Sequence, residues 1–171
     1  MIVNLFHLTV GLSILLCGLV SGLVFGFAAV VMPGIAKLSD REFLLAFKEM
    51  DGIIQNNQPA FMLVWVGSIV TVMATLILGT LNRSRLALTD GQFYLLWAAC
   101  VVYLLAVQLP TVRFNIPLNN ALQVIDVHAL GELELARARA DFEAPWNFWN
   151  RFRTVSAMVS VSGLLALLFL L

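Results

Sequence analysis

The stretch Leu5–Met32, LFHLTVGLSILLCGLVSGLVFGFAAVVM, decides the fold class of this chain. It contains no Asp, Glu, Lys or Arg, and a helix of about 20 apolar residues is long enough to cross the hydrocarbon core of a bilayer. The stretch must be helical because lipid offers no hydrogen-bond partner to the backbone of an isolated span. It therefore predicts a transmembrane helix, and Pro33-Gly34 is expected to end it.

Three further stretches lack those four residue types, at about 61–81, 93–109 and 154–171. Pro110 is expected to end the second of these three. The composition agrees, since 61% of the 171 residues are hydrophobic and 12% are charged, against about 45–50% and about 25% in soluble domains. A chain this short cannot bury such a surplus in its own core. We therefore predict an all-α, multi-pass integral membrane protein, a single domain formed by four transmembrane helices.

The two long connections are predicted to lie on the same side of the membrane, because an even number of spans separates them. The first contains Ser39-Asp40-Arg41-Glu42, which is typical of a capping box. This motif opens an amphipathic helix over 39–55, with an apolar face at helical spacing formed by Phe43, Phe47, Met50 and Ile54. The second connection contains an amphipathic stretch over 117–142 that Gly131 is expected to break.

The distribution of basic residues favours a cytoplasmic location for the long connections. They contain eight of the ten Lys and Arg residues, and the short polar turn between the second and third spans contains the other two, Arg83 and Arg85. The formal net charge is zero, so no basic surface is available to neutralise nucleic acid phosphates.

Small residues form a stripe on the first span at Gly18, Gly22 and Gly26. Such a stripe allows two helices to approach closely in lipid. We expect it to pack against another helix, either within the bundle or in a homo-oligomer. A ligand that lies against the stripe is the lesser alternative.

The sequence contains no recognisable metal or cofactor motif. Cys17 and Cys100 both lie inside apolar stretches and form no CxxC pair, and His7 and His128 are isolated. We therefore predict neither a metal site nor a bound cofactor. A transporter is also disfavoured, since the four spans lack the charged residues that mark an ion pathway.

Polar and aromatic residues gather at the ends of the spans that face the long connections. They form three clusters, at 31–34 with 56–59, at 113–120, and at 146–154. Helix capping is the alternative explanation for the asparagines of the second cluster. An interfacial belt of aromatic rings with snorkelling cations is the alternative for the third.

The same clusters carry a resemblance to a known family. The chain resembles the anthrone oxygenase-like family of small membrane proteins in V-M-P-G at 31–34, N-I-P-L-N-N at 115–120 and W-x-x-W-N-x-x-R-T at 146–154. The resemblance implies oxidation of the activated methylene of an anthrone to a quinone by molecular oxygen, with no metal or organic cofactor. It also implies a hydrophobic, planar aromatic substrate.

A cofactor-free oxygenase must remove a proton from its substrate and hold the resulting anion with preorganised donors. On this basis we expect catalytic roles for Asn115, Asn119, Asn150 and Arg153, and substrate-binding roles for Arg113, Asn120, Trp146 and Trp149. Asp126 and His128 are candidate bases, although no pattern places either of them at the site. The rival hypothesis is a non-catalytic membrane protein that binds a membrane lipid, a quinone or a partner helix through the same face.

Overall fold

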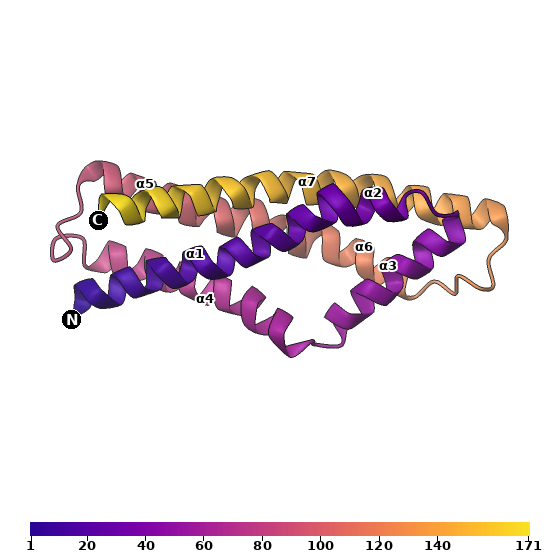
Figure 1. Ribbon diagram of the computed structural model, residues 1–171, viewed down its shortest axis with the longest axis horizontal. Helices are drawn as coiled ribbons and strands as arrows, with labels where there is room; N and C mark the ends of the chain where they lie inside the picture. Colours follow the sequence, from indigo (N-terminus) through magenta and orange to yellow (C-terminus); the bar gives the residue numbers. More distant parts are fainter.

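The computed structural model describes residues 1–171, and it consists of helices joined by short connections (Figure 1). Four of the helices are long and apolar enough to cross a membrane, and there are no strands. The all-α prediction with four spans is therefore confirmed. These four helices are Ile2–Ile35, Pro59–Leu81, Asp90–Gln123 and Glu132–Leu170.

The first and third of these helices each contain segments with wider, π-helical turns. The first comprises α1 (Ile2–Gly26), η1 (Phe27–Val31) and α2 (Met32–Ile35). The third comprises α5 (Asp90–Val101), η2 (Val102–Gln108), η3 (Thr111–Asn115) and α6 (Ile116–Gln123). The remaining helices are α3 (Asp40–Gln55), α4 (Pro59–Leu81) and α7 (Glu132–Leu170).

The first helix ends at Ile35, directly after Pro33-Gly34, as predicted, whereas the prediction that Pro110 ends its helix is wrong. A proline removes one backbone donor, and its ring crowds the carbonyl of the preceding turn. A π-helical segment precedes each of Pro33, Pro110 and Pro117, and its wider turn gives the proline ring room. Local adjustments of this kind let helices in membranes continue through proline.

The α2–α3 turn and the α6–α7 connection lie at one end of the molecule, whereas the α4–α5 turn and both termini lie at the other (Figure 1). α3 runs back from the first end, so that the α3–α4 turn lies near the middle (Figure 1). The capping box at Ser39 is present, with Glu42 as its partner, and it opens α3 as predicted. In the second connection the helix ends at Gln123, and residues 124–131 are not helical. Gly131 then caps α7, which continues without a break from the connection into the fourth span.

α7 is too long for the membrane alone. Its 39 residues measure about 60 Å at 1.5 Å per residue, roughly twice the hydrocarbon thickness of a bilayer. Its first part packs with α3 and α6, and α2 packs against α3. We call the assembly of these four elements the head. The head has its own core, which includes Phe43, Phe47, Leu122, Phe142 and Trp146.

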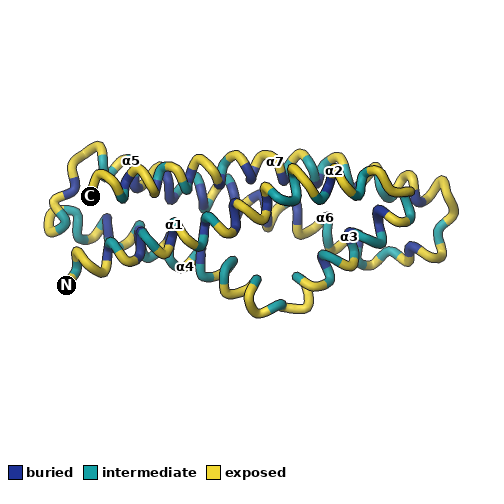
Figure 2. The backbone as a smooth tube through the Cα atoms, in the orientation of Figure 1, coloured by how far each residue is buried: buried dark blue, intermediate teal, exposed yellow.

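The membrane core is a separate cluster at the other end of the bundle. It includes Phe6, Leu96, Tyr103 and Leu164, all fully buried. Figure 2 shows buried positions along the inner sides of the helices in both parts. The polar clusters predicted from the sequence lie at the boundary between the two cores. We therefore expect the functional site at this boundary.

The glycine stripe does not pack within the bundle, and this part of the prediction is wrong. A Cβ added at Gly18, Gly22 or Gly26 would meet no atom within 4 Å. The buried residues of α1, such as Val10, Cys17 and Val24, lie on a different side of the helix. Pairing of the stripe with a second chain stays a prediction. The close helix contacts are instead made at Gly67, Gly79 and Gly163.

Candidate functional site

A pocket of about 360 Å³ lies where the head meets the membrane part of the bundle. Every long helix contributes to it, together with α3. We call it the junction pocket, and it is lined by Leu23, Val24, Phe27, Asp51, Ile54, Gln55, Asn57, Phe61, Met62, Trp65, Thr111, Asn115, Ile116, Asn119, Asn120 and Arg153.

Arg153 is the only cation among these lining residues. It is 7% exposed, and no carboxylate lies within ion-pair distance of it. Its Nε and Nη2 donate to Asn150 Oδ1 at 3.1 and 2.9 Å, and its Nη1 donates to Thr111 Oγ1 at 3.1 Å. A guanidinium has five N–H donors, so these contacts leave it able to donate to a bound anion.

Asn150 does not line the pocket and lies behind Arg153. Its Oδ1 accepts from the guanidinium, and its Nδ2 donates to the carbonyl of Val24 at 3.0 Å. Because both ends of the amide are engaged, Asn150 ties the arginine to α1 and fixes its orientation. The i,i+3 spacing of Asn150 and Arg153 on α7 makes this contact local.

Asn115 lines the pocket and has an unpaired acceptor. The residue is 1% exposed, its Nδ2 faces the carbonyl of Trp146 at 3.4 Å, and its Oδ1 has no partner. The carbonyl of Trp146 sets the orientation of the Asn115 amide, because the flipped orientation would bring Asn115 Oδ1 against the carbonyl oxygen. A buried acceptor without a partner costs about 1–3 kcal/mol, which a ligand with a suitable donor would recover.

Asn119 links the tryptophan of the head core to a buried carboxylate. Trp146 Nε1 donates to Asn119 Oδ1 at 2.8 Å, and Asn119 Nδ2 donates to Asp51 Oδ1 at 2.7 Å. The neighbouring Asn120 accepts from Gln55 Nε2 at 3.2 Å. Asn119 and Asn120 therefore both reach α3 from α6, and helix capping is not what either side chain does.

Asp51 is a pocket residue that was not predicted from the sequence. It is 3% exposed, and no basic side chain is in ion-pair contact with it. A signal was available, because Asp51 follows Phe47 by four residues and Phe43 by eight, and so lies on the apolar face of α3. The candidate bases named from the sequence, Asp126 and His128, lie exposed in the 124–131 connection and line no part of the pocket.

Three of the four predicted substrate-binding residues lie outside the pocket, and one of them, Trp146, belongs to the head core. Trp149 stacks on Phe114, with ring centroids 3.7 Å apart and planes 3° from parallel. Arg113 is exposed, with its guanidinium 5.8 Å from the ring of Phe114. The position of Trp149 agrees with the interfacial belt that was the alternative for the 146–154 cluster.

The aromatic wall of the pocket comes instead from α4 and η1. Phe61 and Trp65 are stacked, with centroids 5.3 Å apart, and Phe27 lines the pocket from η1. Trp65 Nε1 donates to Gln108 Oε1 at 3.0 Å, which holds the indole in place. Single aromatic residues within an apolar span carry no sequence signal that separates a pocket wall from ordinary core.

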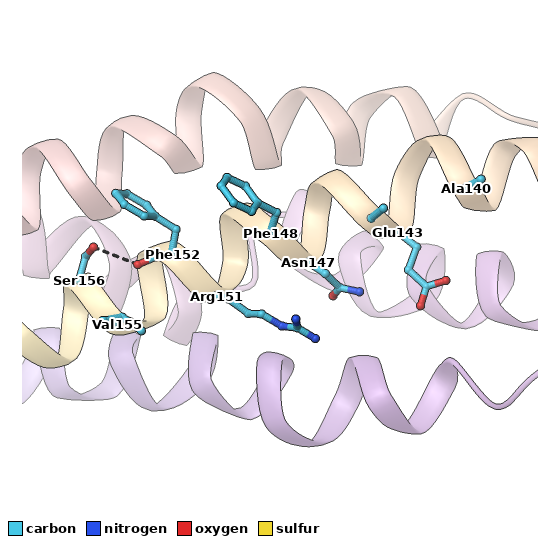
Figure 3. Close-up of a pocket in the computed structure, with 9 residues that line it drawn as sticks. Ala140, Glu143, Asn147, Phe148, Arg151, Phe152, Val155 and Ser156 are labelled. Atoms are coloured by element: carbon cyan, nitrogen blue, oxygen red, sulfur yellow. Dashed lines mark hydrogen bonds between the residues drawn. The ribbon is translucent and has the colours of Figure 1, made fainter.

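A larger hollow of about 850 Å³ runs along the outer side of α7, but all of its lining residues come from that one helix (Figure 3). Phe148 and Phe152 point to one side of the helix, and Asn147 and Arg151 point to the other (Figure 3). No second element brings groups together across it. Its acid, Glu143, is already paired with Arg139 at 2.7 Å.

Nowhere in the chain do three His, Cys, Asp or Glu side chains gather closely enough to hold a metal ion. No curated protein and no solved structure matches the sequence. Residues 58–163 match the family described as anthrone oxygenase. The match covers more than half of the chain and includes Asn115, Asn119, Asn150 and Arg153, whereas Asp51 lies before it. On this match, which agrees with the resemblance seen in the sequence, the chain belongs to the anthrone oxygenase family.

Proposed function

We propose that this protein is a membrane-embedded, cofactor-independent oxygenase that oxidises a hydrophobic, planar aromatic substrate with molecular oxygen. The observation that carries the proposal is Arg153, a buried cation without a carboxylate partner, beside an aromatic wall. A charge in such surroundings is costly unless it is paired. A substrate that becomes an anion during the reaction would supply the missing partner.

The size and lining of the junction pocket suit such a substrate. Small-molecule sites usually measure about 300–1,000 Å³ and combine apolar walls with a few convergent polar groups. The pocket's volume of about 360 Å³ falls within this range. Phe61 and Trp65 offer ring faces for offset stacking on a flat aromatic molecule.

The proposed reaction converts an activated methylene and one O₂ into a carbonyl and one water. Loss of a proton from the methylene leaves an electron pair that is delocalised onto a conjugated oxygen. Arg153 donates to this oxyanion and stabilises it as a preorganised donor. The anion then passes an electron to O₂, the two radicals combine as a peroxide, and the protonated peroxide loses water to leave the quinone carbonyl.

The family membership supports the oxygenase class, and the contacts of the pocket support the assignment of roles. Asn150 and Thr111 orient Arg153, and Asn115 offers its unpaired Oδ1 to a donor on the substrate. Asn119 and Trp146 belong to the network that joins α6 and α7 to Asp51.

Oxygen uptake by the purified protein tests this function. We expect consumption of one O₂ per anthrone and the appearance of the quinone absorbance, unchanged by a chelator. Hydroquinones serve as the second substrate class. Loss of uptake with the chelator would contradict cofactor independence. Binding of the anthrone without any uptake above the rate in protein-free vesicles would favour the non-catalytic rival.

A further inference from the structure

We infer that Asp51 is the base that removes the proton from the substrate, and this inference rests on the proposed function. Asp51 and Arg153 are the only charged residues that line the junction pocket. No His, Glu, Lys or Cys side chain reaches it. A proton that leaves the substrate inside this pocket therefore has one carboxylate available to accept it.

The hydrogen bonds of Asp51 leave one acceptor position open. Its Oδ2 accepts from Gln55 Nε2 at 2.8 Å and from Gln123 Nε2 at 2.9 Å. Its Oδ1 accepts only from Asn119 Nδ2, at 2.7 Å. A carboxylate has about four lone-pair sites, so the vacant one lies on Oδ1.

The three amides are held so that each presents an N–H group to the carboxylate. Asn119 uses its oxygen to accept from Trp146 Nε1, which turns its nitrogen toward Asp51. Gln123 Nε2 also donates to the carbonyl of Lys48, and Gln55 Nε2 also donates to Asn120 Oδ1. Asp51 is therefore held as an acceptor in one orientation at the wall of the pocket, within reach of a bound substrate.

Asp51 and Arg153 come from different elements, α3 and α7, and are not in ion-pair contact. A substrate between them can place its acidic C–H at Asp51 and its conjugated oxygen at Arg153. The C–H bond breaks, the proton moves to Oδ1, and the electron pair delocalises onto the oxygen that Arg153 holds. After O₂ adds to the carbon, Asp51 returns the proton to the peroxide, and water departs as the carbonyl forms.

Anaerobic hydrogen–deuterium exchange tests this step without the oxidation. In D₂O without oxygen, the wild-type protein should exchange the methylene hydrogens of an anthrone faster than buffer does, as followed by NMR. General-base catalysis contributes about 10²–10⁴-fold, so Asp51→Asn should lower the catalysed exchange by at least about 10²-fold. Asp126→Asn, in the exposed connection, is the matched control and should exchange like the wild type.

A purely structural role for Asp51 predicts a different result. Asp51→Asn would then lower the melting temperature and weaken binding of the quinone product. If Asp51 is the base, the same variant keeps its melting temperature and its product binding and loses only the catalysed hydrogen exchange. If Asp51→Asn does not fold, Asp51→Ala is measured with added formate. An exchange rate of Asp51→Ala that rises with formate supports Asp51 as the base. An exchange rate that formate does not change overturns this assignment.

The two proposals can fail separately. If folded Asp51→Asn exchanges hydrogen as fast as the wild type and still takes up oxygen, Asp51 is not the base, and the proposed oxygenase function is unaffected. Wild-type exchange that depends on Asp51, without any oxygen uptake, supports the base and overturns the oxygenase. No wild-type exchange above the buffer rate overturns the base directly.

Discussion

The membrane part and the head satisfy their buried polar groups in different ways. In the membrane part the partners are neutral hydroxyls, as in Ser13 with Thr75 at 3.1 Å and Ser68 with Tyr103 at 2.6 Å. In the head, cationic side chains donate as well as neutral ones, and they bind backbone carbonyls in and beside the connections. Arg41 donates to Val127 and Leu130, Lys48 to Gln123 and Ile125, and Arg139 to Ala36 and Leu38.

This difference follows from the surroundings and locates the function. A charge in lipid is expensive, so the membrane part uses short neutral groups, whereas the head can bring long cations to non-helical backbone. The junction pocket obeys neither rule. It contains a buried cation and a buried anion that are not paired with each other, and an acceptor on Asn115 without a partner. Groups in this state indicate a site that a ligand completes.

The largest expected effect is a loss of oxygen uptake after a substitution in the junction pocket. Arg153→Lys should lower the rate of oxygen uptake by about 10²–10³-fold, the usual cost of losing one oxyanion donor. A lysine carries a charge but cannot reproduce the planar fork that contacts Asn150, Thr111 and a substrate oxygen together. The rate and the melting temperature are measured on the same preparation, to separate activity from folding.

Arg151→Lys is the matched control for this substitution. Arg151 lies two residues earlier on α7, exposed on its outer side, and its replacement should leave the rate unchanged. Equal rates for Arg153→Lys and the wild type would remove Arg153 from the anion site. The arginine would then only connect Asn150 and Thr111.

The next largest effect is on stability, and it compares Gly79, which packs against other helices, with Gly22 of the glycine stripe. A Cβ at Gly79 would crowd Leu96 and would lie 3.1 Å from Phe6, so Gly79→Leu overpacks the membrane core. We expect it to lower the free energy of unfolding in detergent by about 1–3 kcal/mol. Gly22→Leu should leave the stability of the single chain unchanged, because nothing lies within 4 Å of that position.

The same pair of variants tests the predicted homo-oligomer. If two chains meet through Gly18, Gly22 and Gly26, Gly22→Leu will reduce the mass measured by light scattering in detergent, whereas Gly79→Leu will not. An unchanged mass for Gly22→Leu would leave the stripe facing lipid. A fall in stability for Gly22→Leu without a change in mass would contradict the open surroundings of this glycine.

A smaller effect is expected in the head. Arg41 Nη1 and Nη2 donate to the carbonyls of Val127 and Leu130 at 2.6 and 2.9 Å. Arg41→Met keeps the apolar stem and removes both bonds, which should destabilise the 124–131 connection by about 1 kcal/mol. Faster amide hydrogen exchange confined to this connection would show the loss. Arg85→Met, exposed at the opposite end of the molecule, is the control, and equal exchange in the two variants would argue against a role for Arg41.

The sequence was sufficient for features that depend on local rules. Spans without charged residues and the capping box at Ser39 each follow from composition or a short motif. Gly131 lies in the break between α6 and α7 as predicted, but the end of α6 at Gln123, eight residues earlier, was not predicted. The continuation of the helix through Pro110 could not be predicted in this way, because it depends on π-helical segments that neighbouring helices support.

The candidate site was only partly predictable, for a similar reason. Asn115, Asn119 and Arg153 lie at span ends that the topology brings together, so their common pocket followed from the order of the spans. Asp51 depends on how α3 folds back against α6, and Trp149 is drawn away from the pocket by its stack with Phe114. Both depend on tertiary contacts that spacing along one helix does not contain.

The smallest expected effect is a dependence on pH of the protection from hydrogen exchange, which should occur in the head and not in the membrane part. Hydrogen bonds from the Ser39 hydroxyl and then the Ser39 backbone N–H lower the pKa of Glu42 below its ordinary value. A lowered pKa in the folded state means that the stabilisation is complete above the unfolded value, about 4.3, and is lost as the pH falls through the folded value. The amides at the start of α3 should therefore lose protection from hydrogen exchange in acid, after correction for the intrinsic rate, while those of α4 should not. Glu42→Gln keeps a capping-box partner that does not titrate, so its α3 protection should not vary with pH in this window. The same acid-dependent loss in Glu42→Gln would assign the effect to another group.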